Sequence, residues 1–381
     1  MPYFSFSIKE NLNSYNNFNI EPNRIYFSKN TDLWKELHNK KNIKKAFFLK
    51  FEHRKKIKNL RKKILFCLPP NIGLGDAIEY ALAIKSISVK KIFLKIGVAF
   101  AGKHSFILRN YFDIKEIYED AISLDEMNQY DNIFHFTLEI KSLEMQKNIR
   151  ANIIRDICDY FKVDCVDLNN SISNKNKIKK ISIFPISKSP IRTMPISLIN
   201  KLIIELKNYF ELEIYFNKEN EISNYIKNNI TTEDYKIVDP PDAVSLIELM
   251  KNIDYGIFVD SGPLHLAKIF GKKGMLIETS VSKDILIDTY KNLKCVNNTY
   301  KSSYCEAPCG LTDIFNYNKK VGCYDSILVS KKEIIELSKI RTLNRRNIKN
   351  SFLFYLSNPV GCVRELNINK IIKEIKEDLK I

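Results

Sequence analysis

The sequence predicts an α/β protein built from two doubly wound lobes. First, short apolar runs rich in Ile and Phe alternate with segments whose apolar residues recur at helical spacing. Second, this alternation occurs twice, in residues 63–166 and in residues 181–355. Third, residues 167–180 between them are rich in Asn, Ser and Lys and lack an apolar period, which is typical of a linker. Such units form parallel sheets covered on both faces, and we expect them to face a central cleft at the carboxyl ends of their strands, where ligands bind.

Residues 63–166 form the first predicted lobe. The apolar run 62–70 predicts a buried strand, residues 71–76 a glycine turn and residues 77–88 a helix. Further strands and helices are expected, in chain order, within residues 91–100, 104–111, 114–120, 130–136 and 148–163. Residues 1–62 are polar, Asn-rich and free of glycine, and we interpret them as an N-terminal appendage.

Residues 181–355 form the second predicted lobe, and residues 356–381 are expected to be a C-terminal helix. Strands are predicted at residues 181–186, 212–217, 235–240, 255–260 and 274–279. Helices are predicted between them at residues 195–210, 222–230, 244–253 and 263–271.

The chain carries a formal net charge of +17 and 45% hydrophobic residues. The hydrophobic fraction is typical of a globular protein. The positive charge would attract nucleotides, nucleic acids or anionic membranes. We interpret it mainly as a coding bias toward Lys and Asn. The densest basic run, residues 53–63, has little aromatic interleaving, which favours a solvated helix face over a nucleic-acid contact. We therefore expect no nucleic-acid partner.

The cytoplasm is the expected location. No apolar stretch reaches about 18 residues, so no transmembrane helix is expected. The N-terminus lacks a basic region followed by an apolar core, so no secretory signal is expected. Peripheral contact of basic residues with the inner face of the membrane is the one membrane association that we consider.

The stretch Asp260-Ser261-Gly262 ends a predicted strand and opens a helix. The first turn of a helix presents backbone N–H groups and the positive end of the helix dipole, which bind phosphates. Gly262 permits close approach of the backbone, Ser261 adds a hydroxyl, and His265 falls on the first turn, where we expect it to face the ligand. The alternative is an ordinary helix cap with a packed histidine, which this stretch alone slightly favours.

The first lobe has the same strand-turn-helix arrangement. Gly73 and Gly75 form its turn, and Asp76 precedes the predicted helix. This is not the full dinucleotide fingerprint. A carboxylate fixed at a helix start can act as a general base when a hydroxyl lies next to it. The alternative for Asp76 is a helix-capping role.

A third candidate loop follows the first strand of the second lobe. It carries Ser187, Lys188 and Arg192 ahead of a helix. Hydroxyls and cations at this place suit a diphosphate. The alternative is a basic surface loop.

Three stretches together resemble glycosyltransferase family 9, the lipopolysaccharide heptosyltransferases and their relatives, and the resemblance extends over residues 64–380. The specific stretch is "VDSGPLHLAKIFG", which looks like the family's D-[ST]-G-x-x-H-x-A pattern. The stretch "IGLGDAIEYALAIKSI" is similar to its glycine-Asp turn and first helix, and "ISIFPISKSPIRTMP" to a segment that ends with a basic residue and Pro.

The resemblance implies a GT-B fold and an inverting glycosyltransferase that requires no metal. The donor would be a nucleotide sugar, ADP-heptose in the best-known members, and the acceptor a saccharide, a lipid-linked glycan or a protein hydroxyl. Asp76 would be the general base. The donor and its diphosphate would be bound by Ser187, Lys188, Arg192, Asp260, Ser261, Gly262 and His265.

The sequence departs from the family pattern in three places. Arg192 stands where Lys is usual, and Met194 replaces an aromatic residue. Glu278-Thr279-Ser280 stands where relatives have a Phe-Gly turn. That turn belongs to the donor pocket, so the sequence leaves the sugar and the base of the donor open.

Four cysteines fall in the last quarter of the chain: Cys305, Cys309, Cys323 and Cys362. In a cytoplasmic protein such a group is more often reduced or metal-binding than disulfide-bonded. Some relatives carry a cysteine-bound iron in this region, so structural iron or zinc is one interpretation. The spacing departs from the C-x2-C pairs of structural zinc sites, which favours reduced cysteines.

Two other functions fit the same fold. One is a non-catalytic α/β protein that binds nucleotides or nucleic acid through its basic surface, for which binding would depend steeply on salt. The other is a sugar-nucleotide epimerase, which would act without an acceptor.

Overall fold

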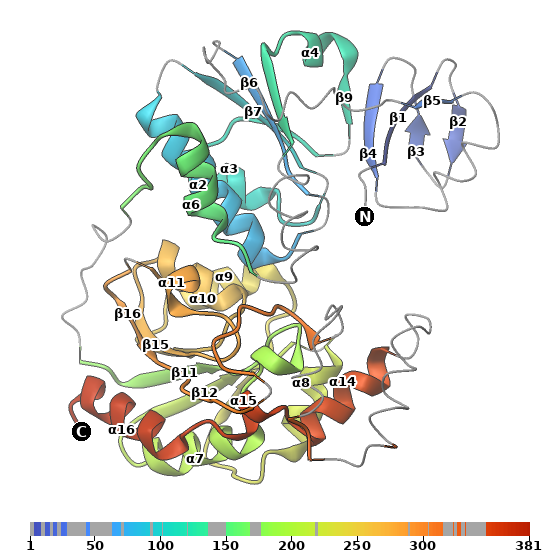
Figure 1. Cartoon of the computed structure of the whole chain (residues 1–381). Coiled ribbons are helices and arrows are strands. Elements are labelled where there is room, and N and C mark those ends of the chain that lie inside the picture. The colour runs from blue at the N-terminus through green and yellow to red at the C-terminus, as the bar shows by residue number, and fades with distance from the viewer. Residues whose placement is uncertain are drawn as a thin grey trace. The chain divides into compact units, whose positions relative to one another are not determined.

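The structure is a computed structural model of the 381-residue chain (Figure 1). It describes residues 63–135 (except 70, 71, 92, 93, 101 and 120), 150–167, 177–314 (except 218, 219, 289 and 304) and 348–381. It also describes five strands between residues 4 and 45, and positions 323, 326–328 and 332. The chain divides into two compact units, residues 1–143 with 153–166 and residues 144–152 with 167–381.

The first unit contains an antiparallel sheet in the order β5-β1-β4-β9. Its strands are β1 (Phe4–Ile8), β4 (Arg24–Ser28), β5 (Ile43–Lys45) and β9 (Ala121–Ser123); β2 (Leu12–Tyr15) and β3 (Phe18–Ile20) form a separate pair. Residues predicted as an appendage therefore supply strands, and the pairing of β4 with β9 joins them to the unit. Residues 29–42 and 46–62 of that predicted appendage lie outside the described residues.

The first unit also contains a parallel sheet in the order β10-β6-β7-β8. The strands are β6 (Lys63–Cys67), β7 (Lys95–Ala99), β8 (Glu116–Tyr118) and β10 (Asn132–His135). The helices are α2 (Leu74–Lys90), α3 (Phe106–Phe112), α4 (Leu124–Asn128) and α6 (Ile153–Phe161). Residues 64–68 are all buried, as expected for a central strand covered on both faces.

The second unit is a six-stranded parallel sheet in the order β13-β12-β11-β14-β15-β16. Its strands are β11 (Lys180–Phe184), β12 (Glu211–Tyr215), β13 (Lys236–Val238), β14 (Tyr255–Phe258), β15 (Lys273–Ile277) and β16 (Leu293–Val296). Its helices are η3 (Pro190–Arg192), α7 (Ile196–Leu206), α8 (Glu221–Asn229), α9 (Ala243–Met250), α10 (Gly262–Ile269), α11 (Lys283–Leu286), α14 (Ile348–Ser357), α15 (Gly361–Arg364) and α16 (Ile368–Leu379). Helices α7 and α16 cover one face, and α9, α10 and α11 lie on the other (Figure 1).

The core of the second unit explains why these segments form a sheet. Alternate residues such as Ile183 and Ile257 are fully buried and belong to one apolar cluster with the buried face of α7. On the other face, the rings of Phe184 and Phe258 stack with centroids 5.1 Å apart. A Cβ at Gly256 would overlap the ring of Phe258, so this close stacking depends on the glycine.

Several predicted boundaries were wrong. Helix α2 begins at Leu74, so Gly75 and Asp76 lie in its first turn and not in a turn before it. Strands β9 and β16 and helix α4 were not predicted. The predicted C-terminal helix 356–381 is divided, because Asn367 caps α16 by accepting a hydrogen bond from the Lys370 N–H. Within the predicted linker 167–180, residues 168–176 lie outside the described residues.

No helix in the described ranges is long and apolar enough to cross a membrane.

Candidate functional site

The candidate site lies in the second unit, where the strand order reverses. Strands β11 and β14 are parallel neighbours. Their following loops leave in opposite directions, since β12 and β13 lie on one side and β15 and β16 on the other. In doubly wound sheets this switch point leaves a crevice at the carboxyl ends of the strands, where ligands bind. The loops concerned are residues 185–195 and 259–262, which the sequence marked as candidates.

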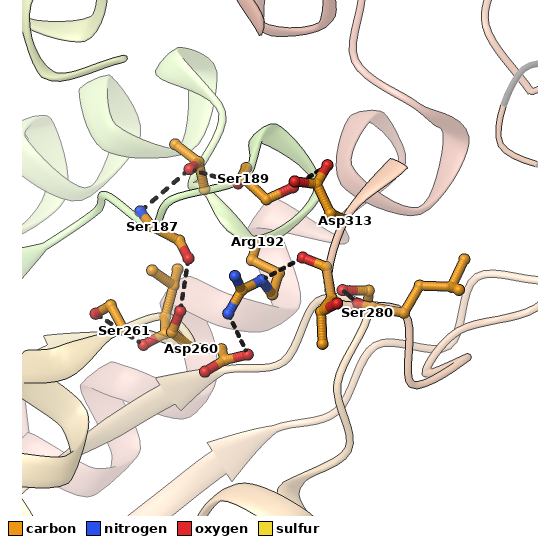
Figure 2. A network of polar contacts seen from close by, with 11 residues as sticks. Ser187, Ser189, Arg192, Asp260, Ser261, Ser280 and Asp313 are labelled. Carbon is orange, nitrogen blue, oxygen red and sulfur yellow. Dashed lines mark hydrogen bonds and ion pairs between the residues drawn. The ribbon is translucent and has the colours of Figure 1, made fainter. Parts of the chain in front are cut away.

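Loop 185–195 is fixed by its own hydroxyl groups and by the loop that follows strand β14 (Figure 2). The Ser187 hydroxyl donates to the Asp260 carbonyl at 2.8 Å. The Ser187 N–H donates to Thr193 Oγ1 at 3.2 Å, and the Thr193 hydroxyl donates to the Ser189 carbonyl at 2.9 Å. Ser187 is 5% exposed. It therefore holds the two loops together, and its contact with a diphosphate stays a prediction.

Arg192 and Asp260 form an ion pair across the switch point, in which the acid is buried and the arginine half-buried. Arg192 Nη1 lies 2.8 Å from Asp260 Oδ2, and the two side chains are 16% and 4% exposed. Arg192 Nε also donates to the Thr312 carbonyl at 2.9 Å. The ion pair explains why the acidic residue Asp260 lies at a predicted phosphate site: its carboxylate orients the Arg192 guanidinium, which is the predicted phosphate-binding group (Figure 2). A buried charge needs such a partner, since an uncompensated one is strongly destabilising.

Helix α10 starts at the same place. Ser261 is its N-cap but makes no capping hydrogen bond, and its hydroxyl donates to the Val259 carbonyl at 3.3 Å. Pro263 has no N–H, and the Leu264 N–H donates to the Ser261 carbonyl at 3.2 Å. The Gly262 N–H has no hydrogen-bond partner among the described residues. An unused amide at the positive end of a helix dipole is suited to an anion.

The other two predicted donor residues lie differently. His265 is 1% exposed, and its Nδ1 lies 3.4 Å from Nζ of Lys268, itself 4% exposed. His265 is therefore buried in this structure, and its place in the donor pocket stays a prediction. Lys188 is exposed.

The candidate base lies in the first unit. Gly73 is the N-cap of α2, with φ −66° and ψ 162°. Asp76 follows in the first turn and is half-buried. An acid in the first turn interacts favourably with the helix dipole. Strand β6, which precedes this turn, lies between β10 and β7 and so borders the strand-order reversal of its own sheet.

The turn after β15 departs from the family pattern and has a structural explanation. The Glu278 carboxylate is buried and accepts hydrogen bonds from the N–H groups of Lys283 at 2.8 Å and Asn298 at 2.9 Å. The Ser280 hydroxyl donates to the Leu311 carbonyl at 2.8 Å. The acid and the serine thus brace the turn against segments that follow it.

The four cysteines of the last quarter lie together. All are free thiols, and all belong to or pack against one apolar cluster that includes Ile191 of η3. Burial raises the pKa of the Cys362 thiol well above its usual value, and the other three thiols raise it further. No group of three or more side chains in the described part of the chain has the geometry to hold a metal ion. An iron or zinc site at these cysteines stays one of the two interpretations of the sequence.

Comparisons with known proteins were made at the level of sequence and of structure. No protein-family model matches the chain, and no curated protein sequence matches it. The iron-containing dodecameric glycosyltransferase TibC from enterotoxigenic E. coli H10407 aligns with a TM-score of 0.51 and 13% identity, over 84% of this chain and 77% of TibC. A glycosyl transferase family 9 protein from Veillonella parvula DSM 2008 aligns with a TM-score of 0.50 and 10% identity, over 84% of this chain and 97% of that one.

A third solved structure, E. coli heptosyltransferase WaaC with ADP-2-deoxy-2-fluoro heptose, aligns with a TM-score of 0.44 and 8% identity, over 66% of this chain and 95% of that one. The chain has the GT-B fold of glycosyltransferases. Its fold is that of the heptosyltransferase-like proteins of family 9, as the sequence resemblance implied.

Proposed function

We propose that the protein is an inverting glycosyltransferase that needs no metal and transfers a sugar from a nucleotide-sugar donor to a hydroxyl group. The proposed acceptor is a saccharide, a lipid-linked glycan or a protein, and heptose is the sugar that the sequence motif favours. One observation carries the proposal: Arg192 is held by Asp260, which lies two residues before Gly262, whose N–H has no partner among the described residues, at the switch point of a doubly wound sheet.

The donor side must stabilise a leaving diphosphate. Arg192 uses Nη1 for Asp260 and Nε for Thr312, so Nη2 is left to donate to a phosphate oxygen. The Gly262 N–H and the dipole of α10 add fixed positive potential. Donors that are already oriented stabilise developing negative charge without reorganisation, which is commonly the largest contribution to catalysis.

The acceptor side requires a base. We assign this role to Asp76, whose carboxylate takes the proton of the acceptor hydroxyl. The acceptor oxygen bonds to the anomeric carbon, the bond from that carbon to the diphosphate oxygen breaks, and the electron pair leaves with the nucleoside diphosphate. A single displacement inverts the anomeric centre. General bases contribute about 10²- to 10⁴-fold to such rates.

The first experiment is a thermal-shift screen with ADP-, GDP-, UDP- and dTDP-sugars, because a ligand that binds only the native state raises the melting temperature. The donor found is then incubated with candidate acceptors, and the anomeric configuration of the product is read by NMR. The Asp76→Asn variant should lose about 10²- to 10⁴-fold in transfer rate and retain donor binding. Asp125→Asn, which removes an acid from the first turn of α4 in the same unit, is the matched control and should retain the rate.

Normal transfer by Asp76→Asn would refute the base assignment. Release of an altered sugar or of free nucleotide without an acceptor would instead indicate an epimerase. Binding of oligonucleotides with a steep salt dependence, and of no nucleotide sugar, would indicate the non-catalytic alternative.

The proposal includes a cytoplasmic location with peripheral contact to the membrane through basic residues. Cosedimentation with vesicles that contain anionic lipids, but not with neutral vesicles, tests that contact.

A further inference from the structure

Residues 309–313, Cys-Gly-Leu-Thr-Asp, run alongside the candidate donor site, and we name this segment the strap. Its backbone carbonyls accept two side-chain hydrogen bonds. Arg192 Nε donates to the Thr312 carbonyl at 2.9 Å, and the Ser280 hydroxyl donates to the Leu311 carbonyl at 2.8 Å (Figure 2). The strap therefore connects the cation of the site to the turn after β15.

Further contacts fix the strap on both sides. The Gly310 N–H donates to the Ser280 carbonyl at 2.6 Å, and the Gly310 carbonyl accepts from the Arg150 N–H at 2.7 Å. Gly310 has φ 80°, a conformation that residues with a side chain rarely adopt. The Ser189 hydroxyl donates to Asp313 Oδ1 at 3.4 Å, which adds a weaker contact to the loop that carries Arg192.

The strap is also anchored in apolar packing. Leu311 and Ile314 are buried at 6% and 0% exposure in the cluster that contains Cys323 and Cys362, and Cys309 packs against that cluster. Close packing of this kind restricts the positions that the strap backbone, and therefore its carbonyl groups, can take.

We propose that the strap positions Arg192 for the diphosphate of the donor, with Ser280 and Ser189 as positioning residues; this inference rests on the proposed function. A guanidinium is planar, so two fixed hydrogen bonds, from Nε and Nη1, set the direction of Nη2. A lysine at this position would act as a point charge, and its orientation would not depend on a hydrogen bond to the Thr312 carbonyl. The strap thus explains how this chain uses an arginine where a lysine is usual in the family it resembles.

The test compares binding of pyrophosphate and of ADP by isothermal titration calorimetry in four full-length proteins: wild type, Ser280→Ala, Arg192→Lys and the double variant. Ser280→Ala should weaken binding of both ligands about 5- to 30-fold, because a buried carbonyl loses its donor and the strap shifts. In the Arg192→Lys background the same change should cost less than about 2-fold, since lysine cannot make the Nε contact. Adenosine, which has no phosphate, tests for a general loss of binding capacity.

Ser86→Ala is the matched control. Ser86 and Ser280 are both fully buried, and each hydroxyl donates to a backbone carbonyl at 2.8 Å, but Ser86 lies in the first unit. Its replacement should lower the melting temperature without changing affinity for pyrophosphate. If Ser280→Ala fails to fold, Ser189→Ala tests the weaker contact to the strap.

Three outcomes decide the matter. Equal affinity of Ser280→Ala and wild type would overturn the inference and leave the proposed function intact. An equal loss in the arginine and lysine backgrounds would show a general structural role and also overturn it. Failure of the wild-type protein to bind pyrophosphate, ADP or any nucleotide sugar would refute the proposed function, and the inference with it.

Discussion

The ion pair between Arg192 and Asp260 gives the sharpest prediction for stability. At 2.8 Å and an effective dielectric constant of about 20, the two charges attract by about 6 kcal/mol. Much of this attraction is offset by the loss of hydration of both groups. Replacement of Asp260 by alanine removes the attraction but leaves a buried cation, for which the typical cost is about 3–5 kcal/mol.

We expect the lower end of that range, about 3 kcal/mol, because the Arg192 side chain keeps 16% exposure. For a unit of this size, that loss lowers the melting temperature by roughly 6–12 °C. Scanning calorimetry is the appropriate assay, since the two units need not unfold in one transition. The transition of the first unit serves as an internal control.

A double-mutant cycle checks the cause. Asp260→Ala and Arg192→Ala together should cost less than the sum of the two single changes, because each single change leaves the other charge uncompensated. A melting temperature for Asp260→Ala within about 2 °C of wild type, or strictly additive losses, would refute the reasoning.

Two further predictions concern pH and thiol reactivity. Hydrogen bonds from Lys201 and then Lys376 lower the pKa of Glu205 from 4.5 to about 2, so its ionised form stabilises the protein above pH 4.5 and that contribution is lost as the pH falls toward 2. Glu205→Gln should melt about 1–3 °C below wild type at pH 7, and the difference should shrink below pH 4.5 in thermal scans; a constant difference would contradict this. Iodoacetamide at pH 8 should modify the exposed Cys165 and not Cys362, since burial raises the pKa of the Cys362 thiol, and peptide mass spectrometry measures both.

The alternation of apolar periods predicted every strand of the second unit's sheet except β16. Strands β11, β12, β14 and β15 are apolar runs bounded by turns. In a chain where such runs alternate with helices, they form the strands of a parallel sheet in most folds. Strand β16 was missed because its sequence, Leu-Lys-Cys-Val, is short and includes a charge. The start of α2 was missed because Gly75, a residue unfavourable in helices, lies within its first turn.

The candidate donor site was only partly predictable. Asp260 and Arg192 were both marked, but nothing in the sequence shows that residues 68 positions apart form an ion pair. The burial of His265 was likewise a matter of tertiary packing. The role of Thr312 was invisible for a simpler reason: its contact uses a backbone carbonyl, which every residue possesses.

Hydrogen bonds to backbone carbonyl groups constrain the sequence of a segment only weakly, because every residue has a carbonyl group. Position 312 can accept many different side chains without loss of the hydrogen bond that its carbonyl supplies, whereas position 311 must stay apolar and position 310 must keep a residue that tolerates a left-handed backbone. Chains that use the same device could therefore share almost no identity in this region. A search for such chains should use spacing and not a sequence motif. The pattern is an arginine after one strand, an acid after the neighbouring strand, and a glycine some fifty residues beyond the acid.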